Sequence, residues 1–131
     1  MSKDFGIEAQ IGVRDSVARY AITMDGRNID ECASLFAQDA SIEVMGETFV
    51  GREQIRSWME MLAENPPGIH LTTNTVVNQI DETHATAISA VGFSKRGEGG
   101  GWQIMVAGFY TDELTLVDGR WLFSKRRISL S

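Results

Sequence analysis

The fold of this chain is decided at residues 69–80, IHLTTNTVVNQI, where the apolar spacing changes from a helical period to alternation. Three later segments alternate in the same way, at residues 84–96, 102–117 and 120–130. Their connections are short and rich in glycine or acidic residues: Asp81-Glu82-Thr83, Gly97–Gly101 and Asp118-Gly119. Such connections are typical of hairpins. The second half of the chain is therefore predicted to be a meander of four antiparallel strands.

Working outward from this stretch, the first half of the chain shows the period of amphipathic helices. We expect three helices, at Glu8–Met24, at Asn28 through Leu35 and Phe36, and at Gly51–Glu64. Between the second and third helices we expect a small hairpin, formed by Ser41–Val44 and Glu47–Val50. Three helices before a long antiparallel sheet form an α+β layout, in which a twisted sheet can curl around the helices and leave a pocket. No repeat or linker divides the chain, so residues 1–131 are predicted to form one domain.

The composition excludes several classes of partner. A net charge of −6 argues against nucleic acid and anionic membrane, because both need basic surface. No stretch approaches the ~20 apolar residues of a membrane span, and the start, MSKDFG, lacks the apolar run of a signal peptide. The single Cys32 excludes an internal disulfide and fits a reducing cytoplasm, which is the expected location.

The candidates for metal, phosphate or thiol chemistry are weak. Cys32 lies amid apolar residues and is interpreted as a packed thiol rather than a nucleophile. Cys and His residues do not cluster, so we expect no metal. The glycine run lacks the Gly-Lys-Ser/Thr ending of a phosphate loop and joins two strands, which favours a flexible hairpin. We expect no cofactor.

Asp25 lies at an unusual position for a carboxylate in an amphipathic helix. At ~100° per residue, one arc of the first helix collects most of its apolar side chains. The arc comprises Ile7, Ile11, Ala18, Ala21 and Ile22, extended by Val13, Val17 and Met24. Asp25 projects near its middle and at the helix C-terminus, where the dipole disfavours an anion, so it should have a partner. Alternatively, Asp25-Gly26 is a turn that caps the helix in solvent.

His70 is the natural partner for this carboxylate. By alternation, His70 shares a polar face with Thr72, Asn74 and Asn78, which faces either solvent or a wet cavity. A carboxylate fixes the imidazole tautomer and stabilises its charged form, which makes the pair a general base. Tyr20 borders the same helical arc and would either donate a phenolic hydrogen bond or pack with its hydroxyl at the rim.

The last strand carries Arg126 next to Arg127, and adjacent residues on a strand point to opposite faces. One guanidinium should therefore face inward, where it needs an anion, either a protein carboxylate or charge developing on a substrate. Alternatively, both are partly solvated at the strand end.

Several landmarks along nearly the whole chain resemble one family. They are Arg19-Tyr20 with Met24-Asp25, then Leu35–Ala40, Gly51-Arg52-Glu53 with Ile55, His70 with Asn74, Gly108-Phe109-Tyr110, and Asp118–Arg126. In this order they resemble the SnoaL-like branch of the nuclear transport factor 2-like superfamily. The resemblance implies a cone, in which a curved antiparallel sheet wraps three helices around a single deep apolar pocket.

The resemblance also implies roles for residues. Members include scytalone dehydratase, bile acid 7α-dehydratase, hexachlorocyclohexane dehydrochlorinase, ketosteroid isomerase and polyketide cyclases. The His–Asp dyad of the dehydratases and the dehydrochlorinase maps onto His70 and Asp25. Tyr20 matches the dehydratase tyrosine, where the dehydrochlorinase has lysine, and Arg126 matches an inward arginine. The expected pocket residues are Tyr110, Val106, Phe93, Asn74 and Trp58. The further histidine and tyrosines of scytalone dehydratase, and the sheet aspartate of the isomerases, have no match.

These observations favour a cofactor-independent lyase acting on a small hydrophobic, cyclic or aromatic substrate. His70 would abstract the proton, Asp25 would orient it, Tyr20 would assist the leaving group, and Arg126 would stabilise negative charge or hold the dyad's geometry. The alternatives are an isomerase or polyketide-cyclase-type aldol enzyme, which needs the same proton abstraction, and a non-catalytic small-molecule binding module. A homodimer or homotrimer through the outer sheet face is expected.

Overall fold

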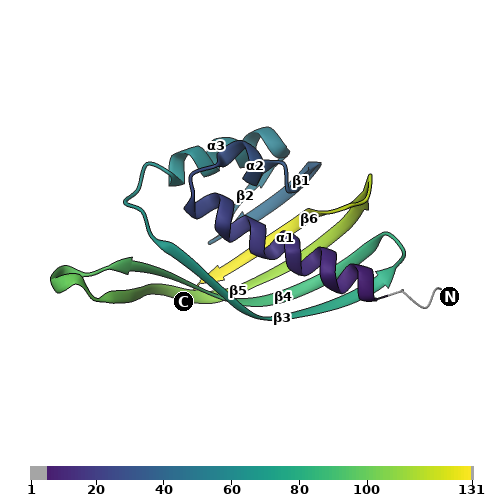
Figure 1. Ribbon diagram of the computed structural model, residues 1–131. Coiled ribbons are helices and arrows are strands. Elements are labelled where there is room, and N and C mark those ends of the chain that lie inside the picture. Colours follow the sequence, from purple (N-terminus) through teal and green to yellow (C-terminus); the bar gives the residue numbers. More distant parts are fainter. Residues whose placement is uncertain (1–5, 131) are drawn as a thin grey trace.

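The computed structural model describes residues 6–130, which form three helices and six strands (Figure 1). In chain order the elements are α1 (Ile7–Asp25), α2 (Ile29–Ala33), β1 (Phe36–Val44), β2 (Glu47–Val50), α3 (Arg52–Leu62), β3 (Ile69–Asp81), β4 (His84–Arg96), η1 (Glu98–Gly100), β5 (Trp102–Val117) and β6 (Arg120–Leu130). The switch from helices to a long meander after residue 68 is as predicted. No helix of the described part is long and apolar enough to cross a membrane.

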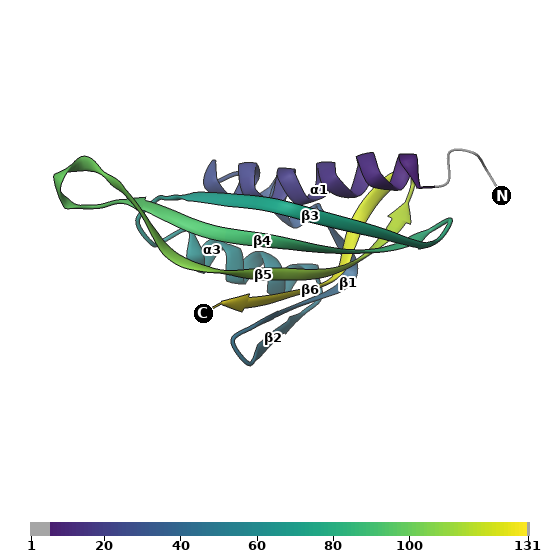
Figure 2. The same cartoon turned by 90° about the horizontal axis from the view of Figure 1, so that it is seen from below.

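The six strands form one open sheet in the order β2-β1-β6-β5-β4-β3. All neighbouring pairs are antiparallel except β1 and β6, which run parallel. The predicted meander of β3 to β6 is antiparallel throughout, and the sheet as a whole is mixed because β1 joins β6 in parallel. The helices lie on one face of the sheet, and the long strands β3, β4 and β5 twist beneath α1 (Figures 1 and 2). The α+β class and the curved-sheet architecture are as expected.

The second helix is shorter than its sequence indicates. It ends at Ala33, and Phe36 already begins β1, so the prediction of a helix through Leu35 and Phe36 was wrong. The Phe123 amide donates to the Leu35 carbonyl at 2.9 Å, and Phe36 is fully buried in register with Phe123. A partner near the far end of the chain thus overrides a local helical preference.

The side of α1 that faces the sheet also differs from the expectation. Ile7, Ile11 and Ile22 are 58%, 67% and 73% exposed, so the centre of the predicted arc faces mostly away from the core. Its extension through Val13, Val17 and Met24 is buried. The buried stripe consists of Ala9, Val13, Ser16, Val17, Tyr20, Ala21, Thr23 and Met24. Because this helix is apolar on more than one side, period alone does not choose the buried side.

Small residues set the distance between α1 and the sheet. A Cβ at Gly12 would lie only 2.4 Å from the Trp121 ring, so glycine is required for this close approach. One turn later, the Ser16 hydroxyl donates to the Trp121 carbonyl at 2.6 Å. This docking of α1 on β6 fixes where the C-terminal end of the helix, with Tyr20 and Asp25, lies over the sheet.

Candidate active site

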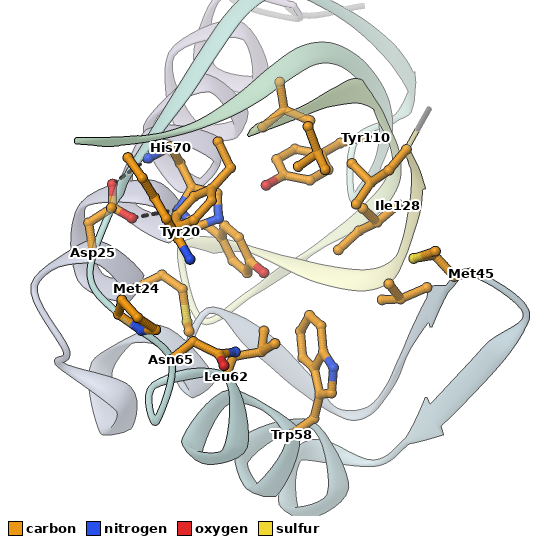
Figure 3. A pocket seen from close by; sticks show the side chains of 18 of the residues that line it. Tyr20, Met24, Asp25, Met45, Trp58, Leu62, Asn65, His70, Tyr110 and Ile128 are labelled. Atoms are coloured by element: carbon orange, nitrogen blue, oxygen red, sulfur yellow. Dashed lines mark hydrogen bonds and ion pairs between the residues drawn. The ribbon is translucent and has the colours of Figure 1, made fainter. Parts of the chain in front are cut away.

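A cavity of about 320 Å³ opens between the C-terminal end of α1, α3 and the sheet (Figure 3). Its wall on β4 follows from strand alternation, because Ser89, Val91, Phe93 and Lys95 point to the same face. Along this face the side chains grow from serine, which is fully buried, to phenylalanine and lysine, which are half-buried. Val91, Phe93 and Lys95 line the cavity.

Asp25 and His70 form a hydrogen-bonded pair at the edge of this cavity (Figure 3). The His70 Nδ1 lies 2.5 Å from one Asp25 carboxylate oxygen, and the His70 backbone N–H donates to the other at 2.8 Å. Both side chains are less than one-fifth exposed. Because the carboxylate accepts from Nδ1, the lone pair of the neutral ring is on Nε2, which has no hydrogen-bond partner among residues 6–130. This is the geometry of an oriented base.

Two phenol groups complete the polar part of the cavity. Tyr20 and Tyr110 are both buried, their ring centroids lie 5.8 Å apart, and their hydroxyls point into the cavity (Figure 3). Neither hydroxyl is hydrogen-bonded within the described part of the chain. Burial raises the pKa of Tyr110 to about 12 and raises the pKa of Tyr20 well above its ordinary value. Both phenols therefore stay protonated at neutral pH and are available as donors.

Arg126 faces inward but does not line the cavity. It is fully buried in a bidentate pair with Asp112, at 2.8 and 2.9 Å, and its guanidinium carbon lies 4.4 Å from the Tyr20 ring and 3.8 Å from the Tyr110 ring. Burial lowers the pKa of Arg126, but Asp112 raises it more, so it remains charged. Of the two anions expected for the inward arginine, the structure supplies the protein carboxylate, Asp112, and the guanidinium packs against both tyrosine rings. Arg127 is exposed and pairs with Glu43 at 2.7 Å.

Asn74 was expected to line the pocket, but it does not line the cavity. Thr73 pairs with Ala90 and Val76 with Ile88, so β3 holds one extra residue at this point. In this β-bulge Asn74 has a φ of 55° and an exposed side chain, a conformation that asparagine tolerates. The bulge reverses the alternation, which explains why Val77, not Asn78, is buried on the face that carries His70.

The other expected pocket residues do border the cavity. They are Tyr110, Val106, Phe93 and Trp58. The Phe93 ring packs on the His70 ring at 4.9 Å, and Trp58 reaches the cavity from α3 (Figure 3). No group of His, Cys, Asp or Glu side chains that could hold a metal ion lies among the residues that the structure describes.

Sequence reasoning missed three charged residues of this region. Asp112 is the anion that Arg126 needs, and it could have been found because it alternates with Tyr110 and Leu114 on the inner face of β5. Lys95 and Arg27 line the cavity, and Lys95 shares the strand face of Phe93. Arg27 carried no periodic signal, because it lies in the turn after α1 with a φ of 61°.

Comparison with protein families gives one match, in which the SnoaL-like domain model covers residues 7–127. Among functionally curated proteins no match is found. Among solved structures, a Mycobacterium tuberculosis protein of unknown function, Rv3472, is similar, with a TM-score of 0.88 and 26% identity over 99% of this chain and 78% of that one.

Two further structures share the fold at lower identity. A Novosphingobium aromaticivorans protein named as a proposed scytalone dehydratase has a TM-score of 0.84 and 19% identity, over 99% of this chain and 89% of that one. LinA has a TM-score of 0.83 and 24% identity, over 95% of this chain and 87% of that one. These similarities show the shared fold.

Proposed function

We propose that this chain, which belongs to the SnoaL-like domain family, is a cofactor-independent lyase that eliminates water from a small hydrophobic cyclic substrate. The family includes dehydratases and other lyases as well as proteins of unknown function. The observation that carries the proposal is the His70 ring, anchored by Asp25 on one nitrogen and open to an apolar cavity on the other. Two free phenols face the same space.

The reaction begins with proton transfer to His70. Nε2 takes a proton from a carbon next to an electron-withdrawing group, and the resulting imidazolium is stabilised by the Asp25 carboxylate. The electron pair of the broken C–H bond forms the new double bond as the neighbouring C–O bond breaks. Such general-base catalysis contributes typically ~10²–10⁴-fold.

The tyrosines favour water as the group that leaves. A departing hydroxide must gain a proton, and the pKa of water is ~15.7. The pKa of Tyr110 is about 12, so its phenol transfers a proton downhill to hydroxide. The tyrosinate then regains a proton from the imidazolium through solvent, which returns both groups to their starting state. A halide would leave without a proton and would gain less from two phenols.

The proposal is tested with 3-hydroxy-1-tetralone, a bicyclic β-hydroxy ketone whose dehydration yields 1-naphthol. Mass spectrometry should show loss of one water at a rate above the buffer control, and His70→Gln should abolish the gain. Deuterium uptake from heavy water without loss of water, across a panel of cyclic hydroxy ketones, would favour the isomerase alternative. Saturable binding with neither exchange nor loss of water would favour a binding module.

A further inference from the structure

Two cations line the cavity of a protein whose overall charge is −6. They are Lys95, near the end of β4, and Arg27, in the turn after α1. Neither forms an ion pair within residues 6–130, and Arg27 donates only to the Asn65 carbonyl, at 2.8 Å. Among the residues that the structure describes, Asp25 is the sole carboxylate that lines the cavity, and it is bound to His70. The positive charge at this site is therefore not compensated by the cavity's own side chains.

Lys95 and the proposed base both lie near the Phe93 ring. Its Nζ lies 5.7 Å from the centre of the Phe93 ring, and that ring packs 4.9 Å from the His70 ring. Lys95 is half-buried and Arg27 is exposed. A ligand that packs on the Phe93 ring is therefore close to both the cation and the base.

We propose that the substrate is an amphipathic anion, in which a carboxylate, sulfonate or phosphate is attached to the cyclic apolar body. The anionic group binds Lys95, and Arg27 adds to the positive potential. The apolar body then packs on Phe93. Orientation follows from charge, because an anion placed beside His70 would meet the Asp25 carboxylate. This inference rests on the proposed function only in assigning the apolar end of the ligand to catalysis.

The test compares two ligands that differ in charge, 4-(1-naphthyl)butanoate and neutral 4-(1-naphthyl)butan-1-ol, by titration calorimetry. At about 0.01 M salt, where the Debye length is about 30 Å, the wild-type protein should bind the acid at least ~5-fold more tightly than the alcohol. Lys95→Met keeps the apolar stem and should remove most of this preference, whereas Lys95→Arg should keep it. Arg27→Gln should reduce it by a smaller factor. At about 1 M salt the preference should shrink.

Matched controls are Lys125→Met and Arg120→Gln, since both residues are exposed on β6 and lie outside the cavity. These variants should keep the wild-type preference. Equal affinity of the wild-type protein for the acid and the alcohol would overturn the inference. A preference for the acid that persists in the double variant Lys95→Met with Arg27→Gln, but disappears in His70→Ala, would also overturn it. If the protein prefers the acid through Lys95 but dehydrates no substrate, the inference is supported and the proposed lyase function is contradicted.

Discussion

The Asp25 carboxylate binds His70 twice, once through the ring and once through the backbone. One oxygen lies 2.5 Å from Nδ1 and the other accepts the His70 amide at 2.8 Å. The backbone bond holds the carboxylate in place whether or not the ring carries its second proton. Asp25 thus serves both as the end of α1 and as the anchor of β3, and it ties the helix to the strand that carries the proposed base.

Replacing Asp25 with Asn should abolish turnover while leaving the fold intact. The amide oxygen can still accept from the His70 backbone, but the amide N–H₂ would donate to Nδ1 and move the ring proton to Nε2, where the lone pair is needed. We expect a fall of ~10²–10⁴-fold in kcat/KM for dehydration. Asp118→Asn, in an exposed turn, is the control. Activity of Asp25→Asn within a factor of about three of wild type would remove the dyad from the mechanism.

Removing either cavity phenol should slow the reaction less. Tyr20→Phe and Tyr110→Phe each delete one donor toward the leaving group, at a cost of about 1–3 kcal/mol, or roughly 5- to 150-fold. Because the described part of the chain offers these hydroxyls no partner, thermal stability should change little. Rates should be compared for a substrate that expels water and an analogue that expels chloride. An equal loss for both would exclude proton donation by the phenols.

Breaking the buried pair beneath the tyrosines should unfold the protein more readily. Arg126 and Asp112 are both fully buried, so Asp112→Asn leaves an uncompensated guanidinium. We expect the free energy of unfolding in urea to fall by about 3–5 kcal/mol. The double variant Arg126→Met with Asp112→Leu should be more stable than Asp112→Asn, because no buried charge remains. A loss below about 1 kcal/mol for Asp112→Asn would show that water reaches the pair.

Cys32 should be unreactive and should make stability fall at alkaline pH. Burial raises the pKa of the thiol from 9.0 to about 11, so the thiolate is scarce in the native state at pH 8 and iodoacetamide should label it only after unfolding. From about pH 9 the unfolded thiol ionises before the native one. The free energy of unfolding should therefore fall between about pH 9 and 11. In Cys32→Ala this decline should be smaller by about 2 kcal/mol. An equal decline in the free energy of unfolding for wild type and Cys32→Ala would contradict the assignment of this pH dependence to Cys32.

The outer face of the sheet should join copies of the chain. Leu71, Ile88 and Phe109 lie on this face of three adjacent strands and are 50%, 50% and 57% exposed. Covering such side chains with a second copy removes apolar surface from water, so we expect a homodimer or homotrimer. Light scattering at micromolar concentration measures the mass directly. Phe109→Glu should yield monomers, and Thr111→Glu at the same face tests whether added charge alone has that effect. A monomeric wild type would refute this expectation.

The sequence by itself determined where the chain changes from helix to strand. Alternation after Ile69 and the short turns at 81–83 and 118–119 follow from backbone geometry, which acts over a few residues. The residue pattern suggested that Asp25 pairs with His70, and the family resemblance supported this pairing and added the fold. The family match and the similar structures confirm the membership and the fold.

Only the tertiary structure decided which faces and partners are used. α1 buries Val13 and Tyr20 rather than Ile7 and Ile11, and Gly12 allows this side of the helix to approach Trp121 closely. The bulge at Asn74, the parallel pairing of Phe36 with Phe123, and the choice of Asp112 as the partner of Arg126 each join residues distant in the sequence. Such choices follow from packing and burial over the whole sheet, and a period of 2 or 3.6 residues carries no information about them.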